Sequence, residues 1–237
     1  MVLTAAVLTV SVAGAQETEE KWTGNVFAGF NMQSGNTKKT AGNLSAAAAR
    51  KMESAELSLK ANISYSESNK MMDGQKWDAL ARYALDFGED NRWYNFYQMY
   101  VDHDYFADID YRLTPSAGLG YHIARTEDFT WDADAGIGYR ITAYRSTSTT
   151  DSDPTALIHT FMKKSIFEKA ALSEDLTVYP GLSKNSGVLV RSETAFTNPL
   201  NEKFDLQLKY IVDHNTEPGV GKKKTDTQFI AGLNYKF

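Results

Sequence analysis

From residue 22 onward, apolar and polar residues alternate in about twelve separate runs, each ended by a polar break. In the last run Phe229, Leu233, Tyr235 and Phe237 fall on one side, and the intervening residues are mostly polar. Successive residues of a β-strand point to opposite faces, so this period of two predicts strands with one apolar and one polar face. We therefore expect an all-β chain, with strands near residues 22–33, 40–51, 54–66, 76–87, 92–103, 109–124, 129–144, 155–167, 170–181, 187–198, 203–214 and 225–237.

Two architectures fit this pattern, and they differ in which face points inward. A soluble lipocalin-like barrel turns its apolar face to a core, whereas a transmembrane barrel turns it to lipid and keeps its polar face in the lumen. The runs are long enough for a tilted membrane crossing, and Tyr and Trp recur near their ends. Long polar connections, such as residues 66–75 and 145–154, alternate with short ones. These features favour a transmembrane antiparallel up-and-down β-barrel of about 12 strands; the soluble binder is the alternative.

The N-terminal segment differs from the rest of the chain. Residues 1–15 are apolar, end in the small-x-small sequence Ala13-Gly14-Ala15 and precede an acidic stretch. This is typical of a secretory signal peptide, here without a basic n-region. We expect residues 1–15 to be removed and residues 16–237 to form an exported outer-membrane barrel. No window reaches the roughly 18 apolar residues of a membrane-spanning helix.

Composition narrows the function classes. The 25 basic and 30 acidic residues give a net charge of −5, which argues against nucleic-acid binding through a basic face. The absence of cysteine excludes disulfides, Cys-ligated zinc and cysteine nucleophiles.

Several short motifs resemble a known family. These are the Trp22-x-Gly24 start, the Ser34-Gly35-Asn36-Thr37 loop, the segments Gly118-Leu119-Gly120-Tyr121 and Ala135-Gly136-Ile137-Gly138-Tyr139, and the aromatic end of the chain. Together they resemble the domain-of-unknown-function 481 family, whose members are often labelled salt-induced outer membrane proteins. The resemblance implies the barrel fold and the bacterial outer membrane, and brings no catalytic residue or substrate. The terminal Phe229, Leu233, Tyr235 and Phe237 also resemble the signature that the barrel-assembly machinery reads.

The sequence gives little sign of an active site. The four histidines, His103, His122, His159 and His214, fall on different strands or strand ends without metal-ligand spacing. We therefore expect no metal site. The Gly-x-Gly segments lie inside strands with no helix after them, which argues against dinucleotide binding, and we expect no cofactor. An outer-membrane barrel enzyme is the less favoured alternative, with His214 at an outer strand end as its candidate residue.

The polar faces predict a charged lumen. Its candidate residues are Asp78, Arg82, Asp110, Arg112, Asp132, Asp134, Arg140, Arg191, Glu193, Asp205, Lys209 and Asp226. Counted over all polar faces, acids exceed bases by five, and carboxylate rings favour cations, so a narrow cation-preferring pore for ions or small solutes is one hypothesis. The other is a structural barrel, linked to envelope stress, plugged by its own ion pairs. As partners we expect lipid, lipopolysaccharide (contacted by Lys222–Lys224) and the assembly machinery, for a monomer that binds no nucleic acid.

Overall fold

The computed structural model describes residues 21–33, 39–167, 169–184, 186–218 and 222–237. The predicted signal peptide and the 34–37 motif lie outside these residues. The described chain forms strands β1 (Trp22–Gln33), β2 (Lys39–Lys51), β3 (Ala55–Ser68), β4 (Met71–Phe87), β5 (Trp93–Asp104), β6 (Ile109–Arg125), β7 (Phe129–Tyr144), β8 (Thr150–Ile166), β9 (Ala170–Pro180), β10 (Val188–Pro199), β11 (Phe204–Asn215) and β12 (Thr225–Lys236). It contains no helix that could span a membrane.

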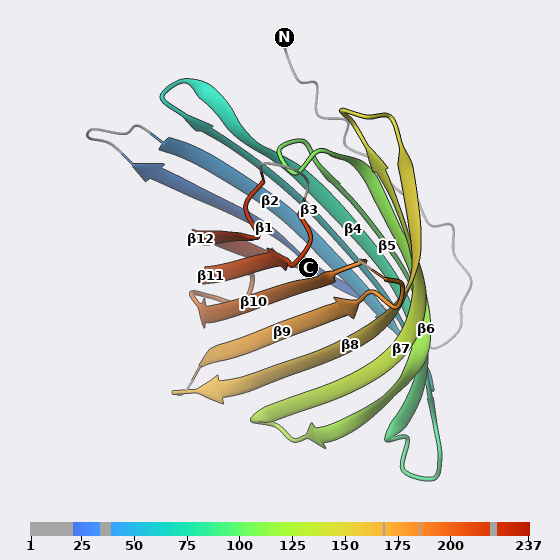
Figure 1. Cartoon of the computed structure of the whole chain (residues 1–237). Coiled ribbons are helices and arrows are strands. Elements are labelled where there is room, and N and C mark those ends of the chain that lie inside the picture. Colours follow the sequence, from blue (N-terminus) through green and yellow to red (C-terminus); the bar gives the residue numbers. More distant parts are fainter. Residues whose placement is uncertain (1–20, 34–38, 168, 185, 219–221) are drawn as a thin grey trace, which may run out of the picture.

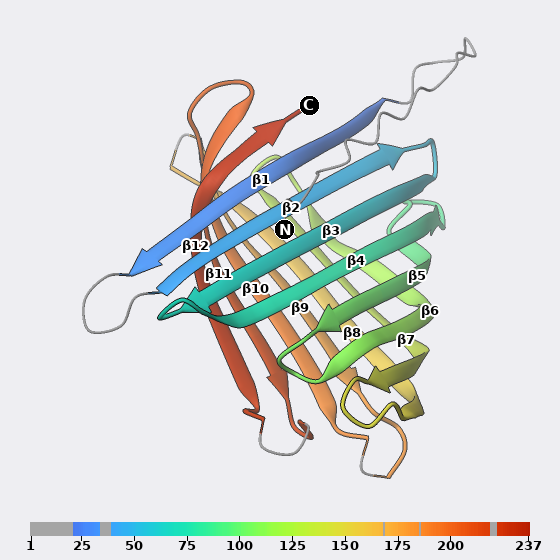
Figure 2. The ribbon, with the colours of Figure 1, turned by 90° about the horizontal axis from the view of Figure 1, so that it is seen from above.

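Each strand pairs antiparallel with its neighbours in sequence, and β1 pairs with β12 to close the barrel (Figures 1 and 2). The predicted all-β up-and-down barrel is therefore confirmed. The closing seam is shorter than any other ladder that the structure describes. It runs from Asn25↔Lys236 to Phe30↔Ala231, whereas β1 pairs with β2 along its whole length. The ends of β1 and β12 beyond Phe30 and Ala231 diverge towards the outer rim (Figure 2).

The apolar face of the sheet points outward. Phe30, Ile63 and Ile137 expose 55%, 57% and 71% of their surface, whereas the carboxylate-bearing Asp102 and Asp134 on the opposite face are buried. A soluble binder would require the reverse arrangement, so the orientation matches a barrel that faces lipid.

Aromatic side chains gather near both ends of the strands. At the end where the chain starts and finishes, Trp93 packs on Tyr121 with ring centroids 4.9 Å apart, and Phe204 packs on Tyr235 at 5.3 Å. Exposed Trp77, Tyr111, Tyr139 and Tyr210 lie towards the opposite, outer end. Such paired girdles mark the two interfaces of a membrane.

Two connections predicted as long loops are instead paired strand. β3 and β4 continue to Ser68 and Met71 and are joined by Asn69 and Lys70, both with positive φ (50° and 66°). β8 begins at Thr150, paired with Ala143, rather than near residue 155. These segments carry polar residues on both faces, so alternation could not reveal them, and backbone pairing extends the hairpins beyond the apolar band.

Candidate functional site

The described strands of the barrel enclose a large cavity of about 1850 Å³. Its lining includes Glu53 and Lys236 at the inner rim and Glu217 and Lys222 at the outer rim. The cavity therefore extends to both ends of the barrel and is the candidate functional site.

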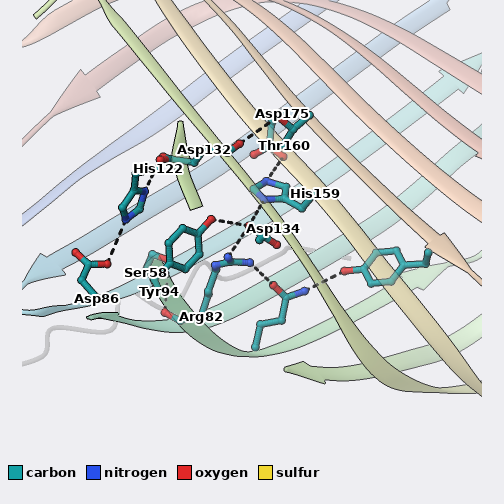
Figure 3. Close-up of polar contacts among 12 residues, drawn as sticks. Ser58, Arg82, Asp86, Tyr94, His122, Asp132, Asp134, His159, Thr160 and Asp175 are labelled. Carbon is teal, nitrogen blue, oxygen red and sulfur yellow. Dashed lines mark hydrogen bonds and ion pairs between the residues drawn. The ribbon is translucent and has the colours of Figure 1, made fainter. Parts of the chain in front are cut away.

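A hydrogen-bonded network occupies the wall of this lumen at mid-height (Figure 3). Asp134 on β7 accepts hydrogen bonds from Tyr94 Oη on β5 at 2.9 Å and Arg82 Nη2 on β4 at 2.8 Å. Its Oδ2 also lies 2.8 Å from Nδ1 of His159 on β8. The Asp134 side chain has no exposed surface. This buried carboxylate on β7 thus links three other strands, β4, β5 and β8.

Buried His122 and partly buried His159 each lie between two carboxylates. His159 contacts Asp134 through Nδ1 and Asp175 through Nε2 at 3.2 Å. His122 contacts Asp132 through Nδ1 at 2.5 Å and Asp86 through Nε2 at 3.2 Å. Each ring therefore joins carboxylates that lie on two different strands.

Sequence analysis missed these pairs because the partners are register neighbours rather than sequence neighbours. His122 is aligned with Asp132 across β6 and β7, and His159 with Asp134 across β7 and β8. Alternation predicts which face a residue occupies, but it does not predict which residue lies opposite. Only the register reveals the contact.

Among the described residues, three ion pairs cross the lumen. Lys60 Nζ on β3 lies 2.9 Å from Asp175 Oδ2 on β9, and these strands are six apart in either direction around the barrel. Lys76 on β4 reaches Asp213 on β11 at 2.7 Å, and the Arg191 guanidinium on β10 lies 3.8 Å from Asp78 on β4. These contacts narrow the passage, in line with the expected cross-lumen ion pairs.

Other ion pairs stay within the wall. Arg112 binds Asp102 through two hydrogen bonds of 2.9 Å, and Lys209 lies 3.0 Å from Glu193. Each pair joins adjacent strands and leaves the lumen uncrossed.

The lumen also contains apolar side chains. Tyr94 and Phe96 on β5 pack with Leu157 on β8 in one buried cluster, and the Arg82 guanidinium covers the Phe96 ring at 4.1 Å. A second cluster, on the opposite wall, joins β1, β11 and β12 and contains Phe27, Ile211 and Ile230. The 92–103 and 155–167 segments carry apolar residues on both faces, so alternation does not predict which of their faces points inward.

The structure places the predicted lumen charges in four different environments. Asp78, Arg82, Arg112, Asp132, Arg140, Arg191, Glu193 and Asp226 line the large cavity. Lys209 lines a much smaller pocket beside it, and Asp134 and Asp205 are buried in the wall. Asp110 does not reach the lumen, because a register shift between Ile109 and Tyr111 turns Ile109 inward and leaves Asp110 exposed.

The charge of the lumen is more balanced than the sequence suggested. Among the described residues, the cavity is lined by fourteen Asp and Glu side chains and twelve Lys and Arg side chains. The difference from the predicted excess of five arises because basic residues of the loops and rims, such as Lys51, Arg125 and Lys222–Lys224, also face the cavity.

Two outer turns are fastened to each other beside the outer mouth. Asp108, between β5 and β6, accepts hydrogen bonds from the Ser146 hydroxyl and, at 3.0 Å, from the Ser146 backbone N–H. The hydroxyl contact is the main reason that the pKa of Asp108 is lowered. Arg145 lies over the Tyr105 ring at 3.6 Å. This side of the mouth therefore has a fixed shape.

His214, the candidate of the enzyme hypothesis, lies at the outer end of β11. Its Nδ1 is 2.7 Å from Thr225 Oγ1, and within the described chain no carboxylate contacts the ring. Its neighbour Asp213 instead pairs with Lys76 and Arg191. A group of three metal-ligating side chains is likewise not found among the described residues.

Comparison with known proteins places the chain in a family. The model of the family described as "Protein of unknown function, DUF481" matches residues 26–237. The chain belongs to this DUF481 family. Among curated proteins, none matches the chain significantly.

Solved structures with a similar fold are bacterial outer-membrane barrels. The COG4313 outer membrane channel from Pseudomonas putida F1 has a TM-score of 0.54 at 12% identity, covering 91% of this chain and 94% of that one. The NanC porin has a TM-score of 0.54 at 14% identity, with coverages of 90% and 100%. The translocator domain of the autotransporter NalP from Neisseria meningitidis has a TM-score of 0.50 at 12% identity, covering 91% of this chain and 87% of that one. At these identities the likeness establishes the fold, which is that of porins, channels and translocators.

Proposed function

We propose that this DUF481 protein is a narrow channel of the bacterial outer membrane for small ions and polar solutes. The observation that carries the proposal is the cavity of about 1850 Å³, whose lining extends from the inner to the outer rim. The outward apolar face and the aromatic girdles support its placement in a bilayer. The likeness to channel and porin barrels supports the same function and no enzymatic one.

A modest cation preference is part of this proposal. Glu56, Asp151 and Asp226 line the cavity and make no ion pair within the described chain, whereas the mid-lumen bases Lys60, Arg82 and Arg191 are all paired with carboxylates. Unpaired carboxylates along a pore attract cations.

Single-channel recording in a planar bilayer with a salt gradient tests both statements. We expect discrete conductance steps and a reversal potential on the cation-selective side. The triple variant Glu56→Gln, Asp151→Asn, Asp226→Asn should move the reversal potential to about half its native value. The matched control changes three exposed carboxylates outside the cavity lining, by the substitutions Glu89→Gln, Glu127→Gln and Glu202→Gln. This control should leave the reversal potential unchanged.

The second candidate function is a closed structural barrel, which the three cross-lumen ion pairs favour. A protein that folds, as shown by its altered gel mobility on heating, and yet stays electrically silent would contradict the channel and favour this alternative.

Contacts outside the chain are proposed as well. Lys222, Lys223 and Lys224 are exposed at the outer mouth, where phosphates of lipopolysaccharide would lie beside a monomer in the outer membrane. Replacing all three with Gln should weaken binding of purified lipopolysaccharide to the detergent-solubilised protein.

A further inference from the structure

The passage through the barrel is confined by side chains on two sides. The cluster of Phe27, Ile211 and Ile230 fills the side formed by β1, β11 and β12. The residual pocket next to this cluster, behind Lys76 and Arg191, has a volume of only about 10 Å³, no more than one water molecule needs. The Tyr94, Phe96 and Leu157 cluster fills part of the opposite side. A solute therefore travels between the two clusters.

The Lys60–Asp175 ion pair crosses that remaining path. It joins β3 to the diametrically opposite β9, and both residues line the large cavity. A solute that travels along this path therefore meets the contact.

The two partners differ in how firmly they are held. Asp175 is fixed from behind, because His159 contacts its other oxygen at 3.2 Å and is itself bound to the buried Asp134. Lys60 has a long flexible side chain that is 48% exposed, and its hydrogen bond goes to Asp175. The ammonium group is therefore the part that can leave, while the carboxylate stays in place.

We propose that the Lys60–Asp175 ion pair is the gate of this channel, and that small solutes bearing a primary ammonium group pass it by replacing Lys60 at Asp175. The inference rests on the proposed channel function and adds the solute class to it. A solute ammonium group makes the same charge-assisted hydrogen bond that Lys60 makes, so the carboxylate remains satisfied throughout the exchange. A neutral solute of equal size leaves Asp175 without the charge-assisted hydrogen bond that Lys60 supplied, with only the His159 contact on its other oxygen.

Two solutes of matched shape test the exchange. Putrescine carries two primary ammonium groups, and 1,4-butanediol carries hydroxyl groups at the same positions. In proteoliposome swelling assays, we expect the native protein to pass putrescine at least five times faster than butanediol. Asp175→Asn should remove this difference. Its folding is checked by heat-dependent gel mobility.

The gate itself is tested by conductance. Lys60→Met removes the crossing ammonium group and should raise the single-channel conductance in potassium chloride at least twofold. The matched control is Lys203→Met, which removes an exposed ammonium group in the turn between β10 and β11, outside the cavity lining, and should leave the conductance unchanged.

The outcomes separate the inference from the channel proposal. A protein that conducts but passes both solutes equally, or whose conductance responds alike to Lys60→Met and Lys203→Met, is a channel with a different gate, and the inference is overturned. A protein that never conducts overturns the channel proposal and this inference with it.

Discussion

At the scale of single residues, the lumen is organised around a few buried charges. Asp134 is the clearest case, because one carboxylate receives contacts from Arg82, Tyr94 and His159 on three other strands. Sequence analysis identified Asp134 as a lumen charge from its parity. It gave no sign of the partners, since these depend on register and on the barrel being closed.

Replacing Asp134 tests how much this network contributes to stability. Asp134→Ala leaves the largely buried Arg82 without its counter-charge, so we expect a loss of about 3 kcal/mol in the free energy of unfolding. Urea unfolding of the protein in detergent micelles, followed by tryptophan fluorescence, measures the change. Asp90→Ala, in the exposed turn after β4, serves as control. Equal midpoints for the two variants would show that the network adds nothing to stability.

At the scale of elements, the strands could be predicted closely because period two is a direct consequence of strand geometry. Predicted and observed bounds of β1 and β7 coincide, and those of most other strands differ by one or two residues. The failures share a cause: Thr150–Asp153 and Ser66–Gln75 lack an apolar face, and the register shift near Asp110 reverses parity without any change in composition. The alternation of apolar and polar residues therefore could not predict the two polar strand extensions or the register shift.

The Gly-x-Gly segments have a structural role in the β6–β7 ladder. Gly118 lies opposite Gly136, and a Cβ at Gly118 would collide with the Ala135 carbonyl oxygen and the Gly136 Cα. Backbone atoms cannot move aside cheaply, so a side chain here forces the strands apart.

This close approach makes a sharp prediction. Gly118→Val should reduce the yield of refolded, heat-modifiable barrel several-fold, because β6 and β7 can no longer pair at their native spacing. Gly42→Val on β2 is the matched control, since a Cβ there meets no atom within 4 Å. The measurement is the yield of each variant after refolding into lipid vesicles, taken as the fraction of protein whose gel mobility changes on heating. A Gly118→Val yield equal to that of Gly42→Val would contradict the crowding argument.

At the scale of the whole molecule, the last strand has two roles. Its outward residues Phe229, Leu233, Tyr235 and Phe237 are all exposed, with 38–59% of their surface accessible. Its main chain closes the barrel, and Phe237 exchanges two backbone hydrogen bonds of 3.0 Å with Gly24. The closure needs the backbone of Phe237, whereas recognition by the assembly machinery would need its ring.

Phe237→Ala separates these roles. We expect it to refold in vitro as well as the native chain but to accumulate several-fold less in the outer membrane of cells, measured by immunoblotting of membrane fractions. Phe204→Ala removes another exposed aromatic ring near the same rim and should accumulate normally. Equal amounts of both variants in the membrane would argue against the terminal signature.

The short β1–β12 seam has a consequence for how the barrel assembles and comes apart. The seam pairs residues from the two ends of the sequence, which are farther apart along the chain than the partners of any other described ladder. Its closure is therefore expected to come late in folding. It is also the ladder with the shortest run of paired backbone. A force that pulls the chain ends apart would therefore peel β1 from β12 first, and the ring would open into a curled sheet while its hairpins remain intact.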